Sequence, residues 1–250
     1  MNYLFKRYIA YLCILFSLFG CDKQIQNERT VTAGPLNSPS IPSTIPNNPQ
    51  SQSQNIALVN PHNSENLQQA PAYFKVTFTS TKGTFVTESH REWAPHGVDR
   101  FYTLIKNGYY TNNAFFRVVP NFIVQFGINP DVTINAAWNT MEIPDDPTLI
   151  ANTRGTLSYG TRGPNTRTTH LIINFKDNSQ HLDPTNAVIA RVIEGMDIVD
   201  SIYSGYGDLP QFGGKSPEPQ RINKEGNNFL AIEYPKLDYI LSTKFITTIN

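Results

Sequence analysis

The aromatic residues of this chain are distributed very unevenly, and this constrains its fold more than any other feature. The chain has 15 Phe, 12 Tyr and 2 Trp, of which six lie between Tyr3 and Phe19, none lies in residues 20–70, and the other 23 follow. Large apolar side chains supply most of the buried area that offsets the entropy lost when a chain becomes ordered. The sequence therefore predicts one folded domain, over residues 71–250.

Net charge and missing motifs exclude several classes of function. Lys and Arg total 20 against 20 Asp and Glu, which argues against binding of nucleic acid through bulk positive charge. The five histidines show no H-x-x-x-H spacing, and the chain has only two cysteines, so we expect no metal site. The segment from Gly155 to Gly160 has the wrong spacing for a hydrolase elbow, and no phosphate-binding loop is present.

The N-terminus has the pattern of an export signal. Lys6 and Arg7 precede an apolar run, residues 8–20, which is shorter than the ~20 residues a spanning helix needs. The run ends in Leu-Phe-Gly-Cys21, which resembles a bacterial lipoprotein processing site. We therefore expect residues 1–21 to be a lipoprotein-type signal, with Cys21 lipidated and the chain anchored to a bacterial membrane, its folded domain in the periplasm or at the cell surface. The alternative is an ordinary membrane-buried cysteine inside a signal peptide.

Residues 22–70 have the composition of a linker. They are rich in Asn, Gln, Ser, Thr and Pro and contain no aromatic residue. Such a segment cannot bury enough apolar surface to become ordered. We expect a disordered tether, which serves either to extend the reach of the domain or simply to clear the membrane surface.

Hydrophobic periodicity predicts a mainly β domain. Alternation over residues 73–79 and 84–87 predicts a hairpin. Residues 97–107 have the apolar spacing of a helix that Gly108 ends, and a second helix fits residues 196–203. Further strands are predicted at residues 114–119, 122–126, 155–159, 170–175, 187–192 and 229–233. Eight short strands and two helices predict an eight-stranded antiparallel barrel capped by two α-helices.

The stretch 115–127 combines large apolar residues with one cation and one amide. If residues 120–122 form the turn, Val119 pairs with Ile123 and Arg117 faces Gln125. A buried arginine without partners would be unfavourable by several kcal/mol. Arg117 is therefore either a surface residue whose stem lies over apolar neighbours or a fixed guanidinium at the edge of an apolar shelf. The second arrangement suits a ligand that offers an apolar ring beside a backbone carbonyl.

Three segments together resemble the cyclophilin-type peptidyl-prolyl cis-trans isomerases. They are Phe-x-Arg-Val-Val-Pro-x-Phe-Ile-Val-Gln-Phe-Gly at residues 115–127, Gly-Pro-Asn-Thr at 163–166, and the segment 187–200. Their order and spacing match the family over nearly all of residues 72–240. The resemblance implies an eight-stranded barrel capped by two helices, and it implies catalysis of X-Pro bond rotation without a cofactor.

The resemblance also implies roles for individual residues. Arg117, Gln125 and Phe122 match the catalytic set of the family. Arg117 would donate to the prolyl nitrogen as the amide twists, Gln125 would hold the substrate backbone and help orient the arginine, and Phe122 would help receive the proline ring. The resemblance also implies that Ile123, Ile172 and Leu182 form the apolar pocket for the proline ring together with Phe122. Gly160 and Thr161 would contact the peptide through their backbone, and Asn186 is the last residue implied in substrate binding.

Several positions depart from the family pattern. Phe116 stands where many relatives have a histidine, Ile172 replaces the usual phenylalanine of the pocket, and Asn186 replaces a pocket-side histidine. His170 replaces a common glutamine, and His181 replaces a tryptophan important for cyclosporin binding. Two hypotheses follow: an isomerase that helps exported proteins to fold, or a catalytically weak module or chaperone that binds proline peptides. The expected partners are proline-containing segments of exported proteins and a membrane, with no nucleic acid, and we expect a monomer.

Overall fold

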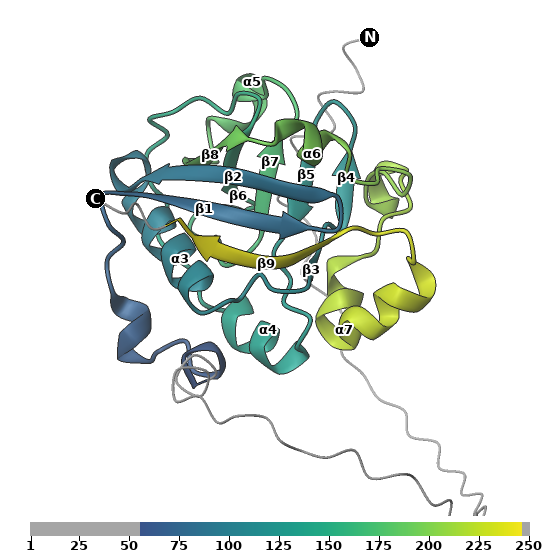
Figure 1. Ribbon diagram of the computed structural model, residues 1–250, viewed down its shortest axis with the longest axis horizontal. Coiled ribbons are helices and arrows are strands. Elements are labelled where there is room, and N and C mark those ends of the chain that lie inside the picture. The colour runs from purple at the N-terminus through teal and green to yellow at the C-terminus, as the bar shows by residue number, and fades with distance from the viewer. Residues whose placement is uncertain (1–55, 247–250) are drawn as a thin grey trace, which may run out of the picture.

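The computed structural model describes residues 56–246 (Figure 1). The predicted signal peptide, Cys21 and the predicted tether up to residue 55 lie outside the described residues. Besides residues 56–59, which are helical, the described residues contain five α-helices: α3 (Pro95–Lys106), α4 (Val132–Asn139), α5 (Ser179–Leu182), α6 (Met196–Asp200) and α7 (Pro219–Glu233). Short 3-10 helices occur at η1 (Ser64–Leu67), η2 (Arg91–Trp93) and η3 (Pro210–Phe212).

The described residues form one curled antiparallel sheet, in the order β3-β9-β1-β2-β8-β6-β7-β5-β4. In Figure 1, β1, β2 and β9 lie in front and β5, β6 and β7 lie behind. The strands are β1 (Tyr73–Ser80), β2 (Gly83–His90), β3 (Asn113–Ala114), β4 (Arg117–Val119), β5 (Ile123–Phe126), β6 (Thr156–Tyr159), β7 (Leu171–Asn174), β8 (Val188–Glu194) and β9 (Tyr239–Phe245).

One short segment connects the two edges of this sheet. β3 pairs with β9 and β4 pairs with β5, yet only Phe115 and Phe116 separate β3 from β4. The amide of Phe115 continues the ladder by donating to the carbonyl of Asp238 at 2.9 Å. Residues 113–119 therefore act as one interrupted strand that closes the sheet. Counted in this way, the sheet has eight strands, as many as the sequence predicts, although the eighth is β9 and not residues 229–233.

Alternation along the strands fills the interior of the curled sheet. Phe74, Val76 and Phe78 of β1 are buried, as their spacing predicts. Phe78 stacks on Phe85 of β2 with ring centroids 4.8 Å apart, and Phe126 of β5 contacts Phe78 edge-on. Aromatic residues of both halves of the sheet therefore meet in one core, which α3 covers on one side.

The prediction of a strand at residues 229–233 is wrong, because these residues form the end of helix α7. The first half of α7 is polar, and Gly226 has a φ of 62°, which interrupts the helical geometry. A five-residue apolar run cannot be assigned to a strand or a helix by periodicity alone. Strand β9 was not predicted, and neither were helices α4 and α5.

The folded part of the chain begins earlier than predicted. Residues 56–59 are helical, and Ala57 is fully buried. The indole Nε1 of Trp138 donates to the carbonyl of Leu58 at 2.7 Å, and the amide of Ala70 donates to Asp99 at 2.9 Å. Residues 56–70 therefore pack against the domain, although the sequence assigns them to the tether. A few small side chains and backbone groups make these contacts, so hydrophobic composition does not reveal them.

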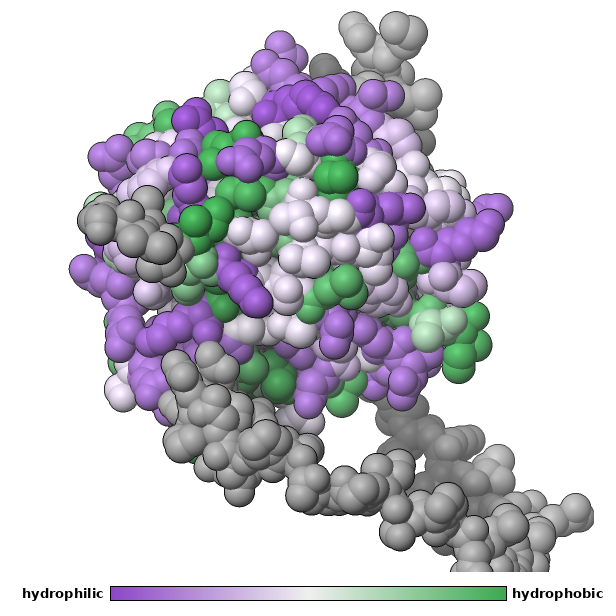
Figure 2. All heavy atoms as spheres, viewed as in Figure 1, coloured by the Kyte–Doolittle hydropathy of each residue, from purple (hydrophilic) through white to green (hydrophobic). Residues whose placement is uncertain are grey.

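The face shown in Figure 2 mixes polar and apolar residues, and its apolar residues lie in separate patches rather than in one continuous area. Among residues 56–246, no helix has both the length and the apolar character needed to cross a membrane.

Candidate active site

Cross-strand register brings the predicted catalytic residues together. Arg117 of β4 pairs with Gln125 of β5, and Gln125 pairs with Ile172 of β7. Val118, Val124 and Ile173 form the adjacent row and point into the core. Because successive side chains alternate between faces, Arg117, Gln125 and Ile172 lie on the opposite, outer face of the sheet. The register predicted from the sequence for β4 and β5 is confirmed.

The guanidinium of Arg117 is held at two of its three nitrogens. Nε donates to Asp208 Oδ1 at 2.7 Å, and Nη1 donates to Gln125 Oε1 at 3.1 Å. Arg117 is 7% exposed, so it is not a surface arginine of the kind that the sequence left open. Nη2 makes no hydrogen bond to any described residue. Both N–H groups of Nη2 therefore remain available to a ligand.

A small apolar cluster, separate from the main core, lies beside this row. It consists of Ile123, Ile172 and Leu182, with Phe122 packed against it. Ile123 follows the β4–β5 turn, Ile172 lies on β7, and Leu182 ends α5. The structure thus unites all four residues that the sequence assigns to a proline pocket.

The turn between β4 and β5 explains how Phe122 reaches this cluster. Asn121 has a φ of 57°, a left-handed conformation that asparagine tolerates. The carbonyl of Phe122 accepts the amide of Phe175 at 2.9 Å and the side-chain amide of Asn178, also at 2.9 Å. The turn is therefore tied to the segment that leads into α5.

Gly160 and Thr161 border the other side of the row. A side chain at Gly160 would come within 3.3 Å of Gln125 Nε2 and 3.6 Å of His170 Cβ, so glycine here leaves room for Gln125. The hydroxyl of Thr161 donates to the carbonyl of Gly163 and contacts the hydroxyl of Thr166 at 3.0 Å. These contacts fix the loop whose backbone is predicted to bind substrate.

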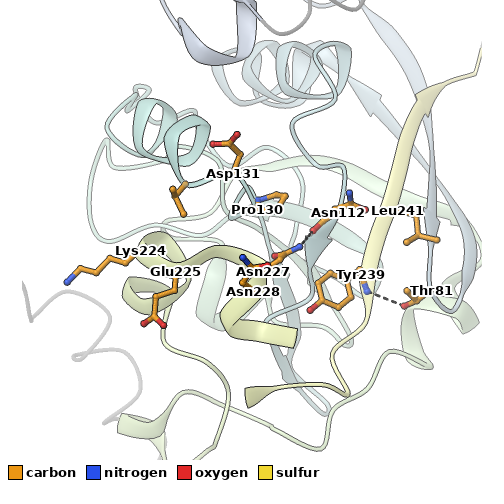
Figure 3. Close-up of a pocket in the computed structure, with 11 residues that line it drawn as sticks. Thr81, Asn112, Pro130, Asp131, Lys224, Glu225, Asn227, Asn228, Tyr239 and Leu241 are labelled. Carbon is orange, nitrogen blue, oxygen red and sulfur yellow. Dashed lines mark hydrogen bonds between the residues drawn. The ribbon is translucent and has the colours of Figure 1, made fainter. Parts of the chain in front are cut away.

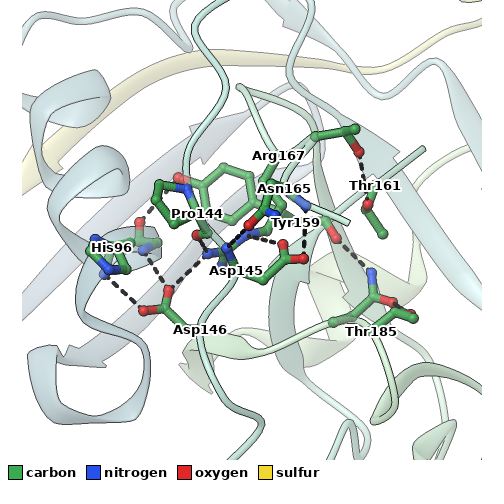
Figure 4. A network of polar contacts seen from close by, with 12 residues as sticks. His96, Pro144, Asp145, Asp146, Tyr159, Thr161, Asn165, Arg167 and Thr185 are labelled. Carbon is green, nitrogen blue, oxygen red and sulfur yellow. Dashed lines mark hydrogen bonds and ion pairs between the residues drawn. The ribbon is translucent and has the colours of Figure 1, made fainter. Parts of the chain in front are cut away.

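The Gly-Pro-Asn-Thr segment shapes that loop rather than carrying chemistry. Asn165 and Asp145 exchange two hydrogen bonds, each of 2.8 Å, from the backbone of one to the side chain of the other. Arg167, almost fully buried, pairs with Asp146 at 3.0 Å and donates to the carbonyl of Pro144. Asp146 in turn accepts the amides of His96 and Gly97 at the start of α3 (Figure 4). This network anchors the loop to the body of the domain.

Asn186 lies behind the site rather than on its surface. It is 2% exposed, its side-chain amide donates to the carbonyl of Tyr159 at 2.6 Å, and its Oδ1 accepts from Thr185. With both side-chain groups engaged, Asn186 can act on a substrate only through its neighbours. Its predicted direct contact with substrate therefore has no support in this arrangement.

His170 is half-buried and lies near Gln125. Its ring contacts Phe116 edge-on at 5.7 Å, and its Nε2 is buried without a partner among the described residues. Burial and, to a lesser extent, the positive charge of Arg162 lower the pKa of His170 to about 4. His170 is therefore neutral at physiological pH.

Sequence reasoning missed two residues of the site, Asp208 and Phe212. Both lie in the segment after α6, outside the three segments that resemble the family. Phe212 lies over the guanidinium, 5.8 Å from its carbon to the ring centroid. No local pattern signals this contact, because Asp208 lies 91 residues from Arg117 in sequence.

A separate surface cavity of about 760 Å³ lies beside α7 and β9. Its lining includes Asp131, Lys224, Asn227 and Tyr239, and Figure 3 shows the side chain of Asn227 bonded to the carbonyl of Asn112. None of the predicted site residues lines it. Among the described residues, no group of three or more His, Cys, Asp or Glu side chains is placed to hold a metal ion.

Comparison with known proteins identifies the family. Residues 73–224, more than half of the chain, match the family described as cyclophilin type peptidyl-prolyl cis-trans isomerase/CLD. The chain belongs to the cyclophilin-type peptidyl-prolyl cis-trans isomerases. A peptidyl-prolyl cis-trans isomerase of Acinetobacter baylyi is 34% identical over 135 residues, covering 51% of this chain and 70% of the relative. Peptidyl-prolyl cis-trans isomerase-like 3 of Neurospora crassa is 34% identical, covering 47% and 75%.

Solved structures agree with the cyclophilin fold. A crystal structure of a cyclophilin-type isomerase from Cryptosporidium parvum superposes with a TM-score of 0.53 at 17% identity, covering 70% of this chain and 99% of that one. A second structure of that protein, determined in the presence of the dipeptide Ala-Pro, gives a TM-score of 0.52 at 18% identity, with the same coverage. The predicted mainly β fold of this cyclophilin is confirmed.

Proposed function

We propose that this cyclophilin accelerates X-Pro bond rotation in exported proteins, with Arg117 as its principal catalytic residue. One observation carries the proposal: the row Arg117, Gln125 and Ile172 adjoins an apolar cluster that contains Phe122. A proline ring can rest on this cluster while the peptide backbone lies against Gln125. That a structural neighbour was determined in the presence of Ala-Pro supports a proline-containing ligand.

The reaction needs only the twisted amide to be stabilised relative to both planar forms. Delocalisation of the nitrogen lone pair gives the X-Pro bond a rotational barrier of ~18–20 kcal/mol. As the amide twists, the prolyl nitrogen regains its lone pair and can accept a hydrogen bond. Arg117 supplies the donor, and its free nitrogen is Nη2. The bond forms only in the transition state, so it lowers the barrier without also stabilising the ground state.

Removal of the guanidinium tests this role. We expect Arg117→Ala in the full chain to lower the rate of cis/trans exchange of an Ala-Pro peptide by about 100-fold, the scale of one lost transition-state donor. Exchange NMR measures the rate and the peptide affinity in one sample. Arg154→Ala removes an exposed arginine that pairs with Asp200, and it should leave exchange unchanged.

The outcome separates the two hypotheses. An active parent and an inactive Arg117→Ala support the isomerase. If the parent binds the peptide but does not accelerate exchange, the chain is a proline-peptide-binding module or chaperone. In that case Ile172→Phe, which restores the usual aromatic of the pocket, is the next variant to test.

The N-terminal sequence supports an exported, lipid-anchored form. Cys21 follows a short apolar run of the signal type, and the lipid on its thiol would anchor the domain to a bacterial membrane. In bacteria fed a labelled fatty acid, the parent should take up label and sediment with membranes, whereas Cys21→Ala should do neither. A Cys21→Ala variant that still carries label would contradict lipidation at this residue.

A further inference from the structure

The loop of residues 205–216 is folded tightly on itself. The amide of Lys215 donates to the carbonyl of Tyr206 at 2.8 Å, and the amide of Ser216 donates to the carbonyl of Asp208 at 3.0 Å. Gly214 packs so closely on the Asp208 backbone that any side chain there would collide with it. The backbone of Asp208 is therefore fixed by its own loop, independently of Arg117.

This loop aims a buried carboxylate at the catalytic arginine. The side chains of Asp208 and Arg117 are 9% and 8% exposed. Oδ1 of Asp208 accepts from Arg117 Nε at 2.7 Å and from the amide of Leu209 at 2.7 Å. Oδ2 is buried and has no hydrogen-bond partner among the described residues.

The two bonds to Arg117 leave its guanidinium little freedom. A planar guanidinium bonded at Nε and at Nη1 cannot rotate about its last torsion without breaking one of them. Its third nitrogen, Nη2, is then held in one orientation. We infer that Asp208 is a positioning residue for the isomerase reaction, which fixes the plane of Arg117 so that Nη2 is presented to the twisting prolyl amide.

A structural role alone does not account for this pair. Burying two charges costs desolvation energy that their attraction often fails to recover, so a buried ion pair is weak evidence of stabilisation. A preoriented donor, in contrast, needs no reorganisation when the reaction occurs. The ring of Phe212, from the same loop, covers the guanidinium. One loop thus both orients Arg117 and shields it from water.

The inference rests on the proposed isomerase function, so the test begins with the activity of the parent. Asp208→Ala removes the acceptor, whereas Asp208→Asn keeps an oxygen at the same place and removes the charge. Asp200→Ala removes an exposed carboxylate that also pairs with an arginine and serves as the control. Exchange NMR on the full chain with an Ala-Pro peptide separates the rate on the enzyme from the peptide affinity, and the Nε–Hε signal of Arg117 reports its hydrogen bond.

We expect Asp208→Ala to lower the rate on the enzyme at least about tenfold while peptide affinity changes less than about threefold. Its Arg117 Nε–Hε signal should shift and exchange faster with water. Asp208→Asn should retain a rate within about threefold of the parent, and Asp200→Ala should match the parent. Rescue by the asparagine variant would not be expected if the charge of the pair served only to stabilise the fold.

Other outcomes overturn the inference. An Asp208→Ala variant as fast as the parent would make the pair irrelevant to turnover, and a faster one would make it an inhibitory contact. If Asp208→Ala fails to fold, Asp208→Asn decides, because an asparagine variant that folds and loses activity as severely as Arg117→Ala would contradict positioning by a hydrogen bond. A parent without exchange activity would overturn the proposed function and this inference with it.

Discussion

At the scale of single residues, His170 links the site to the pH dependence of stability. Burial lowers the pKa of its imidazole from the usual 6.5 to about 4. Below pH 6.5 the unfolded chain therefore binds a proton that the folded chain excludes. The free energy of unfolding then falls as pH drops from 6.5 to 4, and below pH 4 the loss stops growing.

We predict that His170→Gln removes this part of the pH dependence. The pKa shift corresponds to about 2 to 3 kcal/mol of unfolding free energy between pH 7 and pH 4.5. The parent should lose this stability on acidification, whereas the variant should not. Urea unfolding at several pH values measures the difference. His62→Gln, which changes an exposed histidine, should behave like the parent. Parallel pH profiles for the parent and His170→Gln would contradict a neutral His170 in the folded chain.

The residues of the site were predictable to different degrees. Arg117 and Gln125 could be paired from the sequence because a three-residue turn fixes the register of the strands on either side of it. The two residues are only eight positions apart in sequence. The contact with Asp208 spans 91 residues and depends on how the loop 205–216 packs after the sheet has closed, which no local pattern specifies.

At the scale of elements, Asn178 joins two walls of the proline pocket. Its side-chain amide donates to the carbonyl of Phe122, in the β4–β5 turn, and to Asn174 Oδ1 on β7, at 2.9 and 2.8 Å. It also stands directly before α5, which carries Leu182. The side chain of Asn178, which is 1% exposed, therefore joins the turn to β7, and its backbone carbonyl accepts the amide of Leu182 in α5.

We predict that Asn178→Ala destabilises the domain and weakens peptide binding. It leaves Asn174 Oδ1 without this donor, which typically costs about 1–3 kcal/mol for a buried group. Asn178→Asp should be at least as harmful, because a carboxylate would face two acceptor oxygens. Urea unfolding and NMR titration with an Ala-Pro peptide measure both effects. An Asn178→Ala variant with the stability and peptide affinity of the parent would show that the pocket walls are held by other contacts.

Element prediction succeeded where the periodicity was clear. The alternation in β1 and the 3.6-residue spacing in α3 each place one apolar face on the core. Helix α7 was missed because Ile222 stands alone in a polar first half, and the bend at Gly226 separates it from Phe229 and Leu230. Its short apolar end then has the composition of a strand.

At the scale of the whole molecule, residues 56–70 extend the domain beyond the boundary that aromatic content predicts. Besides the contacts of Leu58 and Ala70, the side chain of Asn107 at the end of α3 donates to Asn66 at 2.8 Å. Residues 56–70 touch α3 and α4, whereas the proposed catalytic row lies on β4, β5 and β7. Their contribution should therefore be to stability and not to turnover.

We predict that a chain starting at residue 71 is less stable than one starting at residue 56 by about 2 to 4 kcal/mol. The shorter chain loses the buried Ala57 and leaves the indole Nε1 of Trp138 without its acceptor, and both losses oppose folding. Trp138→Phe should cost less in the shorter chain than in the longer one, because the bond to Leu58 exists only in the longer chain. Urea unfolding of the four proteins completes this double-mutant cycle. Equal unfolding midpoints for the chains that start at residues 56 and 71 would show that residues 56–70 contact the domain without stabilising it. The stable domain would then begin at residue 71, as the sequence predicts.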